Sequence, residues 1–159
     1  MKSKLTRDEV IGSLTKKIDE VLQPLLPPGS SCALLDFPNH SNVGDSAIWL
    51  GEKAYLRRHR VEVVYTCDTK NCSPLRLRER LGNGTILLNG GGSFGDMWPR
   101  YQRFREEVVE SFPDHKIIVM PQSIYFRDTE NLQRAKRILN EHPDMTLLVR
   151  DHRSLEFAR

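Results

Sequence analysis

Residues 85–96 read Thr85-Ile86-Leu87-Leu88-Asn89-Gly90-Gly91-Gly92-Ser93-Phe94-Gly95-Asp96, an apolar run followed by three consecutive glycines. The apolar run predicts a buried strand, and a helical pattern follows the glycines. Because glycine carries no side chain, backbone N–H groups here would be open to an anion or a sugar. We therefore expect the glycine segment, defined as residues 89–96, to form one wall of a binding site.

The rest of the chain alternates short apolar runs with helical patterns, which predicts an α/β fold. Strands are predicted at residues 32–37, 61–66, 85–88, 116–120 and 145–149, and helices at about 46–58, 73–81, 101–112, after Asp128, and from Asp151 onward. This alternation is typical of right-handed βαβ crossovers. We expect a doubly wound parallel sheet of about five strands, a Rossmann-like arrangement.

Two strand orders, 3-2-1-4-5 and 2-1-3-4-5, are compatible with this pattern. In the second order the first and third strands are neighbours, so the loops that follow them lie side by side. These loops, residues 39–45 and 89–96, are the richest in glycine and asparagine. We therefore favour 2-1-3-4-5.

Residues 1–29 predict an amphipathic leader helix and turn, ahead of a domain at residues 30–159. Thr6-Arg7-Asp8-Glu9 has the form of a capping box. Apolar residues then recur at helical spacing: Val10, Leu14, Ile18, Val21 and Leu25. The polar face of this helix is not strongly basic, which favours packing on the edge of the domain over a membrane-surface anchor.

Composition and charge are those of an ordinary globular protein and give no reason to expect nucleic acid. The 159 residues carry a formal net charge of +3, with 38% apolar and 28% charged residues. No apolar run approaches the roughly 20 residues of a membrane span, so only peripheral membrane contact is expected. The three cysteines and the absence of a signal-peptide pattern favour the cytoplasm. Their spacing predicts no metal site.

Short polar residues in the predicted loops are the first candidates for ligand binding. Asn42 and Ser93 lie beside glycine, and Gln122 and Ser123 follow the fourth strand at the same rim. Asp45 and Asp96 precede predicted helices, where an N-cap role is as strongly indicated as a ligand role. On the helix at 46–58, small residues are expected to face the sheet: Ala47, Gly51 and Ala54, with Leu50.

Histidine and arginine side chains provide the candidates for proton transfer and anion binding. His40 has the only type of side chain with an unperturbed pKa near neutrality, but the sequence shows no partner for it. Arg100, Arg103 and Arg105 follow the glycine segment and could pair with a phosphate or carboxylate, although a solvated helix face is favoured. Arg150 follows the last strand and is expected to point toward the rim.

Four landmarks occur in a fixed order and together resemble the polysaccharide pyruvyl transferases. They are Ser41-Asn42-Val43-Gly44-Asp45-Ser46-Ala47-Ile48, residues 88–96, Met120-Pro121-Gln122-Ser123 and Val149-Arg150-Asp151. The resemblance spans roughly residues 30–159. It implies a GT-B-like protein of two Rossmann-like halves, of which this chain is similar to the N-terminal half, truncated at its C-terminus.

The resemblance also implies an activity. Such enzymes transfer the enolpyruvyl carbons of phosphoenolpyruvate onto two hydroxyls of a sugar in an exopolysaccharide or cell-surface glycan, making a cyclic ketal and releasing phosphate. Phosphoenolpyruvate is the donor, no other cofactor is implied, and the partner is a sugar or lipid-linked saccharide. The Arg and His groups for the donor belong largely to the C-terminal half. Acceptor or cleft-lining roles carry over to Asn42, Gly44, Asp45, Gly91, Gly92, Ser93, Gln122 and Ser123.

Two other functions remain open at this point. A GT-B-like glycosyltransferase that uses a nucleotide sugar would share the half-fold. A non-catalytic binding or assembly module is the other alternative, and in it the apolar Leu155 and Phe157 of the last helix would be buried in an oligomer. No catalytic residue is assigned, and Arg150 is the arginine we expect to bind an anion.

Overall fold

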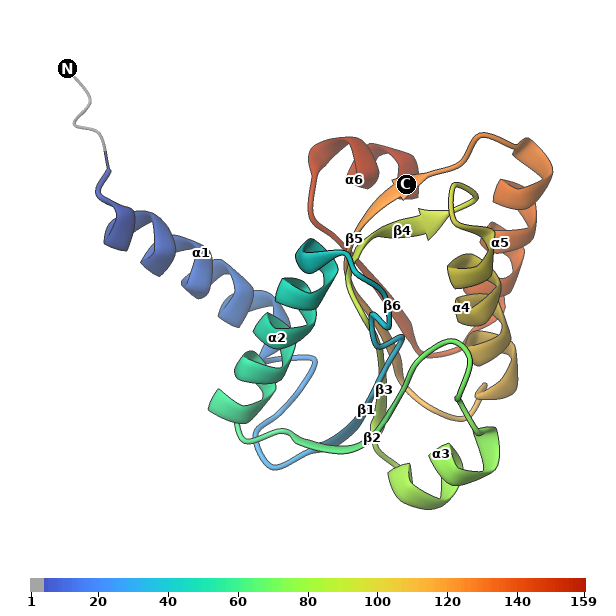
Figure 1. Ribbon diagram of the computed structural model, residues 1–159, viewed down its shortest axis with the longest axis horizontal. Helices are drawn as coiled ribbons and strands as arrows, with labels where there is room; N and C mark the ends of the chain where they lie inside the picture. The colour runs from blue at the N-terminus through green and yellow to red at the C-terminus, as the bar shows by residue number, and fades with distance from the viewer. Residues whose placement is uncertain (1–4) are drawn as a thin grey trace.

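The computed structural model describes residues 5–159, which form a six-stranded parallel sheet with helices on both faces (Figure 1). The strands are β1 (Ser31–Leu35), β2 (Glu62–Cys67), β3 (Thr85–Leu88), β4 (Gly91–Gly95), β5 (Ile117–Tyr125) and β6 (Met145–Val149). The helices are α1 (Arg7–Leu22), α2 (Val43–Arg58), α3 (Pro74–Leu81), α4 (Pro99–Ser111), α5 (Thr129–Glu141) and α6 (His152–Ala158). The predicted α/β class is confirmed.

Alternate residues of the central strands pack into two separate apolar cores. Leu35 and Leu88 face the core that α3, α4 and α5 cover, whereas Leu34 and Leu87 face the core that α2 covers. Successive side chains of a strand point to opposite faces, so strands that are apolar throughout are buried on both sides. The continuous apolar runs therefore belong to the middle of the sheet.

The strand order β2-β1-β3-β5-β6 is the predicted 2-1-3-4-5 order for the five strands expected from sequence. Leu35 and Leu88 are register partners at the ends of β1 and β3. The residues that follow them, Asp36 and Asn89, therefore emerge side by side. This register brings the loop after β1 next to the glycine segment.

The glycine segment contains a strand that the sequence does not predict. Gly91–Gly95 forms β4, which pairs in parallel with the far half of β5, Phe94 opposite Ile124. β5 has nine residues because its first half pairs with β3 and its second half with β4. The expectation that the glycines turn directly into a helix is wrong, since glycine permits extended backbone as readily as a turn.

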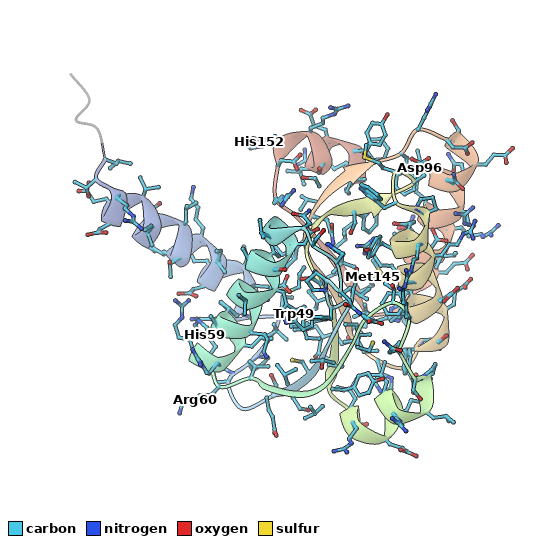
Figure 2. The ribbon with its side chains drawn as sticks, in the orientation of Figure 1. Trp49, His59, Arg60, Asp96, Met145 and His152 are labelled. Atoms are coloured by element: carbon cyan, nitrogen blue, oxygen red, sulfur yellow. The ribbon has the colours of Figure 1, made fainter. Side chains whose placement is uncertain are left out.

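Helix α2 presents its large side chains to the sheet. Trp49, Tyr55 and Leu56 are buried, and Figure 2 shows Trp49 between α2 and the strands. The small residues expected on this face point outward instead, and Leu50 is 65% exposed. Burying a large aromatic side chain stabilises the fold more than burying a small side chain does, because more apolar surface leaves water. This difference decides the orientation of the helix.

Helix α1 has the predicted capping box but packs on the domain only at its end. The Thr6 hydroxyl accepts from the Glu9 N–H, and the Glu9 side chain accepts from the Thr6 N–H. Figure 1 shows α1 extending away from the domain, and Leu14 and Ile18 are about half exposed. The contacts with the domain come from Asp19, which pairs with Arg58 and His59, and from Leu22 and the turn after it. Residues 1–4 of the predicted leader lie outside the described residues.

None of the helices within residues 5–159 combines the length and apolarity needed to cross a bilayer. The division of the chain at residue 29 into a leader and a domain stays a prediction.

Gly95 tests the pairing of β4 with β5. Its φ is +124°, and a Cβ there would overlap the carbonyl oxygen of Tyr125. We expect Gly95→Ala to lower the free energy of unfolding by about 3 kcal/mol or more, measured by urea denaturation. Gly51→Ala is the control, because Gly51 lies in α2 with no heavy atom near an added Cβ. That variant should gain about 0.5–1 kcal/mol. Equal effects would contradict the β4 assignment.

Candidate functional site

A cleft of about 490 Å³ opens at the carboxyl ends of β1 and β3. Five of the predicted ligand residues line it: Asn42, Asp45, Gly92, Ser93 and Arg150. The two predicted loops do lie together here, since a Cβ added to Gly91 would come within 3.4 Å of Asp45 Oδ1. In open α/β sheets, ligands bind in such crevices beyond the carboxyl ends of neighbouring strands. This cleft is the candidate site.

The other predicted residues support the cleft without lining it. Gln122 is fully buried and its amide donates to the Asn89 carbonyl at 2.7 Å. Ser123 lies within β5, accepts from Arg150 Nε at 2.9 Å and donates to Asp151 at 2.6 Å. The Gly44 N–H donates to Asn42 Oδ1. Direct substrate contacts by these residues stay predictions.

His40 acquires the carboxylate partner that the sequence does not reveal. Its Nε2 lies 3.6 Å from Asp45 Oδ2, and its Nδ1 accepts from the Asn42 N–H at 3.3 Å. Because Nδ1 is an acceptor, the neutral ring carries its proton on Nε2, toward the carboxylate. The Asn42 side chain donates to the same Asp45 oxygen at 2.9 Å. The cleft therefore contains a hydrogen-bonded group able to exchange a proton.

Neither aspartate that was expected to cap a helix does so. Asn42 is the N-cap of α2, and Asp45 lies in the first turn, where its charge suits the positive end of the helix dipole. Asp96 accepts from the N–H groups of Arg127 and Asp128, at 2.8 and 2.7 Å. Figure 2 shows Asp96 at the corner where β4 approaches α5. The N-cap of α4 is Trp98, which makes no side-chain cap bond.

Arg105 is buried, contrary to the solvated position that its sequence context predicts. It was expected on a solvated helix face, but it is 0% exposed. Its guanidinium donates to Asp36 Oδ2 at 3.2 Å and to the Ser93 carbonyl at 2.9 Å, and it also bonds the Ser93 hydroxyl. Arg105 lies three residues before Val108, within the apolar stripe of α4. That spacing was the sequence signal for an inward-facing side chain.

Asp36, the partner of Arg105, was also missed. It directly follows β1, lines the cleft, and has a φ of +68°, a conformation that non-glycine residues rarely adopt. Burial raises the pKa of its carboxyl to about 6, although the Arg105 charge opposes this. Its Oδ1 has no hydrogen-bond partner. A strained acidic residue with one free oxygen is typical of a functional position.

Most of the residues that line this cleft lie within a region that matches a known family. A sequence profile described as polysaccharide pyruvyl transferase matches residues 42–159. The chain belongs to the polysaccharide pyruvyl transferase family. Its match includes the α2 N-terminus, the glycine segment and Arg150, and therefore most of the cleft wall.

Named relatives agree with this assignment. The chain is 36% identical over 147 residues to EpsO of Bacillus subtilis, a protein provisionally named a pyruvyl transferase. It is 38% identical over 132 residues to Pyruvyl transferase 1 of Schizosaccharomyces pombe. These alignments cover 92% and 79% of this pyruvyl transferase family chain, but only 45% and 33% of the two relatives. The chain thus spans less than half the length of either relative.

The cleft of this pyruvyl transferase family member offers amide, carboxylate, hydroxyl and guanidinium groups around bare glycine backbone. Such groups suit a polyhydroxylated or anionic ligand. Within residues 5–159, no three His, Cys, Asp or Glu side chains are grouped to hold a metal ion.

The buried Arg105–Asp36 pair should dominate the stability of the cleft floor. We expect Arg105→Met to lower the free energy of unfolding by ~3–5 kcal/mol, because it leaves Asp36 buried without its cation. The double variant with Asp36→Asn should lose clearly less than the sum of the two single changes. Urea denaturation measures all three. Arg103→Met, on the exposed side of α4, is the control. Additive losses would contradict a coupled pair.

Proposed function

We propose that this chain provides the acceptor-binding half of an enzyme that transfers the pyruvyl carbons of phosphoenolpyruvate to a saccharide. The acceptor would be a sugar, free or lipid-linked, of an exopolysaccharide or cell-surface glycan. One observation carries the proposal: Asn42 and Asp45 line one cleft with the glycine segment, and all of these residues lie inside the region that matches the family. Side-chain amide and carboxylate groups beside glycine backbone suit the hydroxyls of a sugar.

The proposed reaction balances without any other co-reactant. C3 of phosphoenolpyruvate takes up a proton, which makes C2 electrophilic. One sugar hydroxyl adds to C2 and releases its proton, phosphate then leaves, and the second hydroxyl closes the ketal and releases its proton in turn. Of the two hydroxyl protons, one is equivalent to the proton gained by C3 and the other leaves with phosphate. The site must therefore exchange protons and stabilise anions.

His40 and Arg150 are the groups of this chain proposed for these tasks. His40 is held by the Asn42 N–H on one nitrogen and faces Asp45 with the other, which suits a general acid or base. Arg150 points into the same cleft, and its Nη2 lies 3.4 Å from where a Cβ on Gly92 would be. A guanidinium at this position can pair with the phosphate or carboxylate of the donor.

The relatives are longer than this chain. Because the chain covers less than half of each, a second Rossmann-like half would form the opposite wall and hold most of the donor.

A cytoplasmic location fits the three free cysteines, Cys32, Cys67 and Cys72. Oligomerisation through α6 stays a prediction. Phe157 stacks on Phe126 within the chain, which leaves Leu155 as the large apolar residue of α6 that is exposed.

Phosphate release from phosphoenolpyruvate tests the activity. In a protein that contains both halves we expect release only when a saccharide acceptor is present, and we expect the acceptor to stabilise this chain thermally. A chain stabilised by nucleotide sugars, with no response to phosphoenolpyruvate and saccharides, would instead support a glycosyltransferase. A chain that binds neither class would favour an assembly module.

Paired variants test the two assigned residues. We expect His40→Asn to lower kcat by about 10²-fold with little change in acceptor affinity, because general acid or base catalysis typically contributes this much or more. Arg150→Ala should mainly raise KM for phosphoenolpyruvate. His152→Asn and Arg153→Ala, both exposed on α6, are the matched controls. If His40→Asn and His152→Asn had the same kinetics, the role of His40 would be wrong.

A further inference from the structure

Glu52 is a buried acidic residue directly behind the glycine segment. It lies on the sheet-facing side of α2 and is only 7% exposed, whereas its neighbours Gly51 and Lys53 are exposed. Its Oε1 accepts from the Gly90 N–H at 2.9 Å, across 38 residues of sequence. This bond links α2 to the turn between β3 and β4, and Gly90 also lines the cleft.

A side chain at Gly90 would have no space between β5 and Glu52. A Cβ at Gly90 would lie 2.8 Å from the Pro121 carbonyl oxygen and 3.1 Å from Glu52 Oε1. The backbone of the glycine segment is therefore held between β5 and the Glu52 carboxyl. A displacement of the Glu52 side chain therefore also displaces the backbone of Gly90 that lines the cleft, because close-packed interiors transmit small displacements.

The surroundings of Glu52 favour its neutral form. Four buried side-chain oxygens, on Glu52 and on residues at or near the carboxyl ends of β1, β3 and β5, have no hydrogen-bond partner: Glu52 Oε2, Asp36 Oδ1, Asn89 Oδ1 and Gln122 Oε1. Each is an acceptor when the carboxyls are ionised, and a protonated Glu52 adds an O–H donor to this group. Burial raises the pKa of Glu52 to about 8, with the Gly90 N–H opposing and the Asp36 charge adding to the rise.

We propose that Glu52, as a neutral carboxylic acid, is the positioning residue of the glycine segment, and that ionisation of Glu52 releases this segment from the shape that lines the cleft. An ionised carboxylate in this enclosed place lacks water, so it must turn outward or admit water. Turning outward breaks the bond to Gly90, and water that enters competes with Glu52 for the Gly90 N–H. That this also controls saccharide binding rests on the proposed function.

Few charged groups face Glu52. Asp36 at the end of β1 is the acidic neighbour, and Arg105 of α4 lies behind it as its counter-ion. From the β3 and β5 side, the polar side chains are the neutral amides of Asn89 and Gln122. Glu52 is therefore protonated at pH values below about 8, and it loses its proton as the pH rises through this value.

The Gly90 amide resonance reports this step without any substrate. In the wild-type chain we expect the 15N and 1H shifts of Gly90 to titrate with a midpoint near pH 8. Glu52→Gln keeps the oxygen acceptor for Gly90 and cannot ionise, so its Gly90 resonance should stay constant over this range. Glu62→Gln, an exposed site on β2, is the control and should titrate as the wild type does. A Gly90 resonance that is constant in the wild type would overturn the proposal.

Saccharide affinity measured by calorimetry connects this step to binding. We expect affinity of the wild type to fall about 10-fold one pH unit above the midpoint, because only the neutral fraction is competent. Glu52→Gln should keep its affinity, whereas Glu52→Ala should bind weakly at every pH. An equal fall in wild type and Glu52→Gln would overturn the role of Glu52 and leave the proposed function standing. Titration of Gly90 with no binding of saccharide or phosphoenolpyruvate would overturn the proposed function and leave the positioning role.

Discussion

The buried guanidinium of Arg105 joins three parts of the fold that the cleft depends on. It comes from α4, pairs with Asp36 at the end of β1, and holds the carbonyl and hydroxyl of Ser93 in β4. A buried cation is tolerated only when an opposite charge pairs with it, and removing that partner leaves an uncompensated charge. These three elements are therefore constrained to keep one relative position. Ser93 and Asp36 both line the cleft, so the ion pair also sets the width of its floor.

The glycines of the glycine segment each have a different neighbour, which accounts for their number. Gly90 is held between Glu52 and the Pro121 carbonyl, and Gly95 packs against the backbone of Tyr125. Gly91 and Gly92 instead face the side chains of Asp45 and Arg150 from the opposite side of the cleft. A side chain at either of these two positions would fill space between the walls. The segment is thus both a strand and a surface for close approach.

The last helix also contributes to the cleft. Asp151 caps α6 and accepts from Ser123, which in turn accepts from Arg150 Nε. The Ser154 hydroxyl accepts from the Ile124 N–H, which fixes α6 against β5. Arg150 is therefore oriented by two elements, and its position over Gly92 follows from both. The same short stretch, Val149-Arg150-Asp151, is one of the landmarks that suggested the family.

By itself, the sequence determined the α/β class, the strand order and five of the residues that line the cleft. These depend on local apolar periodicity and on which loops follow which strands, and both are visible in one dimension. Only the tertiary structure decided the strand at Gly91–Gly95, the burial of Arg105, Asp36 and Glu52, and the pairing of His40 with Asp45. Each of these depends on a partner at least five positions away, and for Arg105 and Glu52 the partner is 69 and 38 residues distant. A charged side chain becomes stable inside the protein only when folding brings that partner to it, so its own residue type predicts a solvated position.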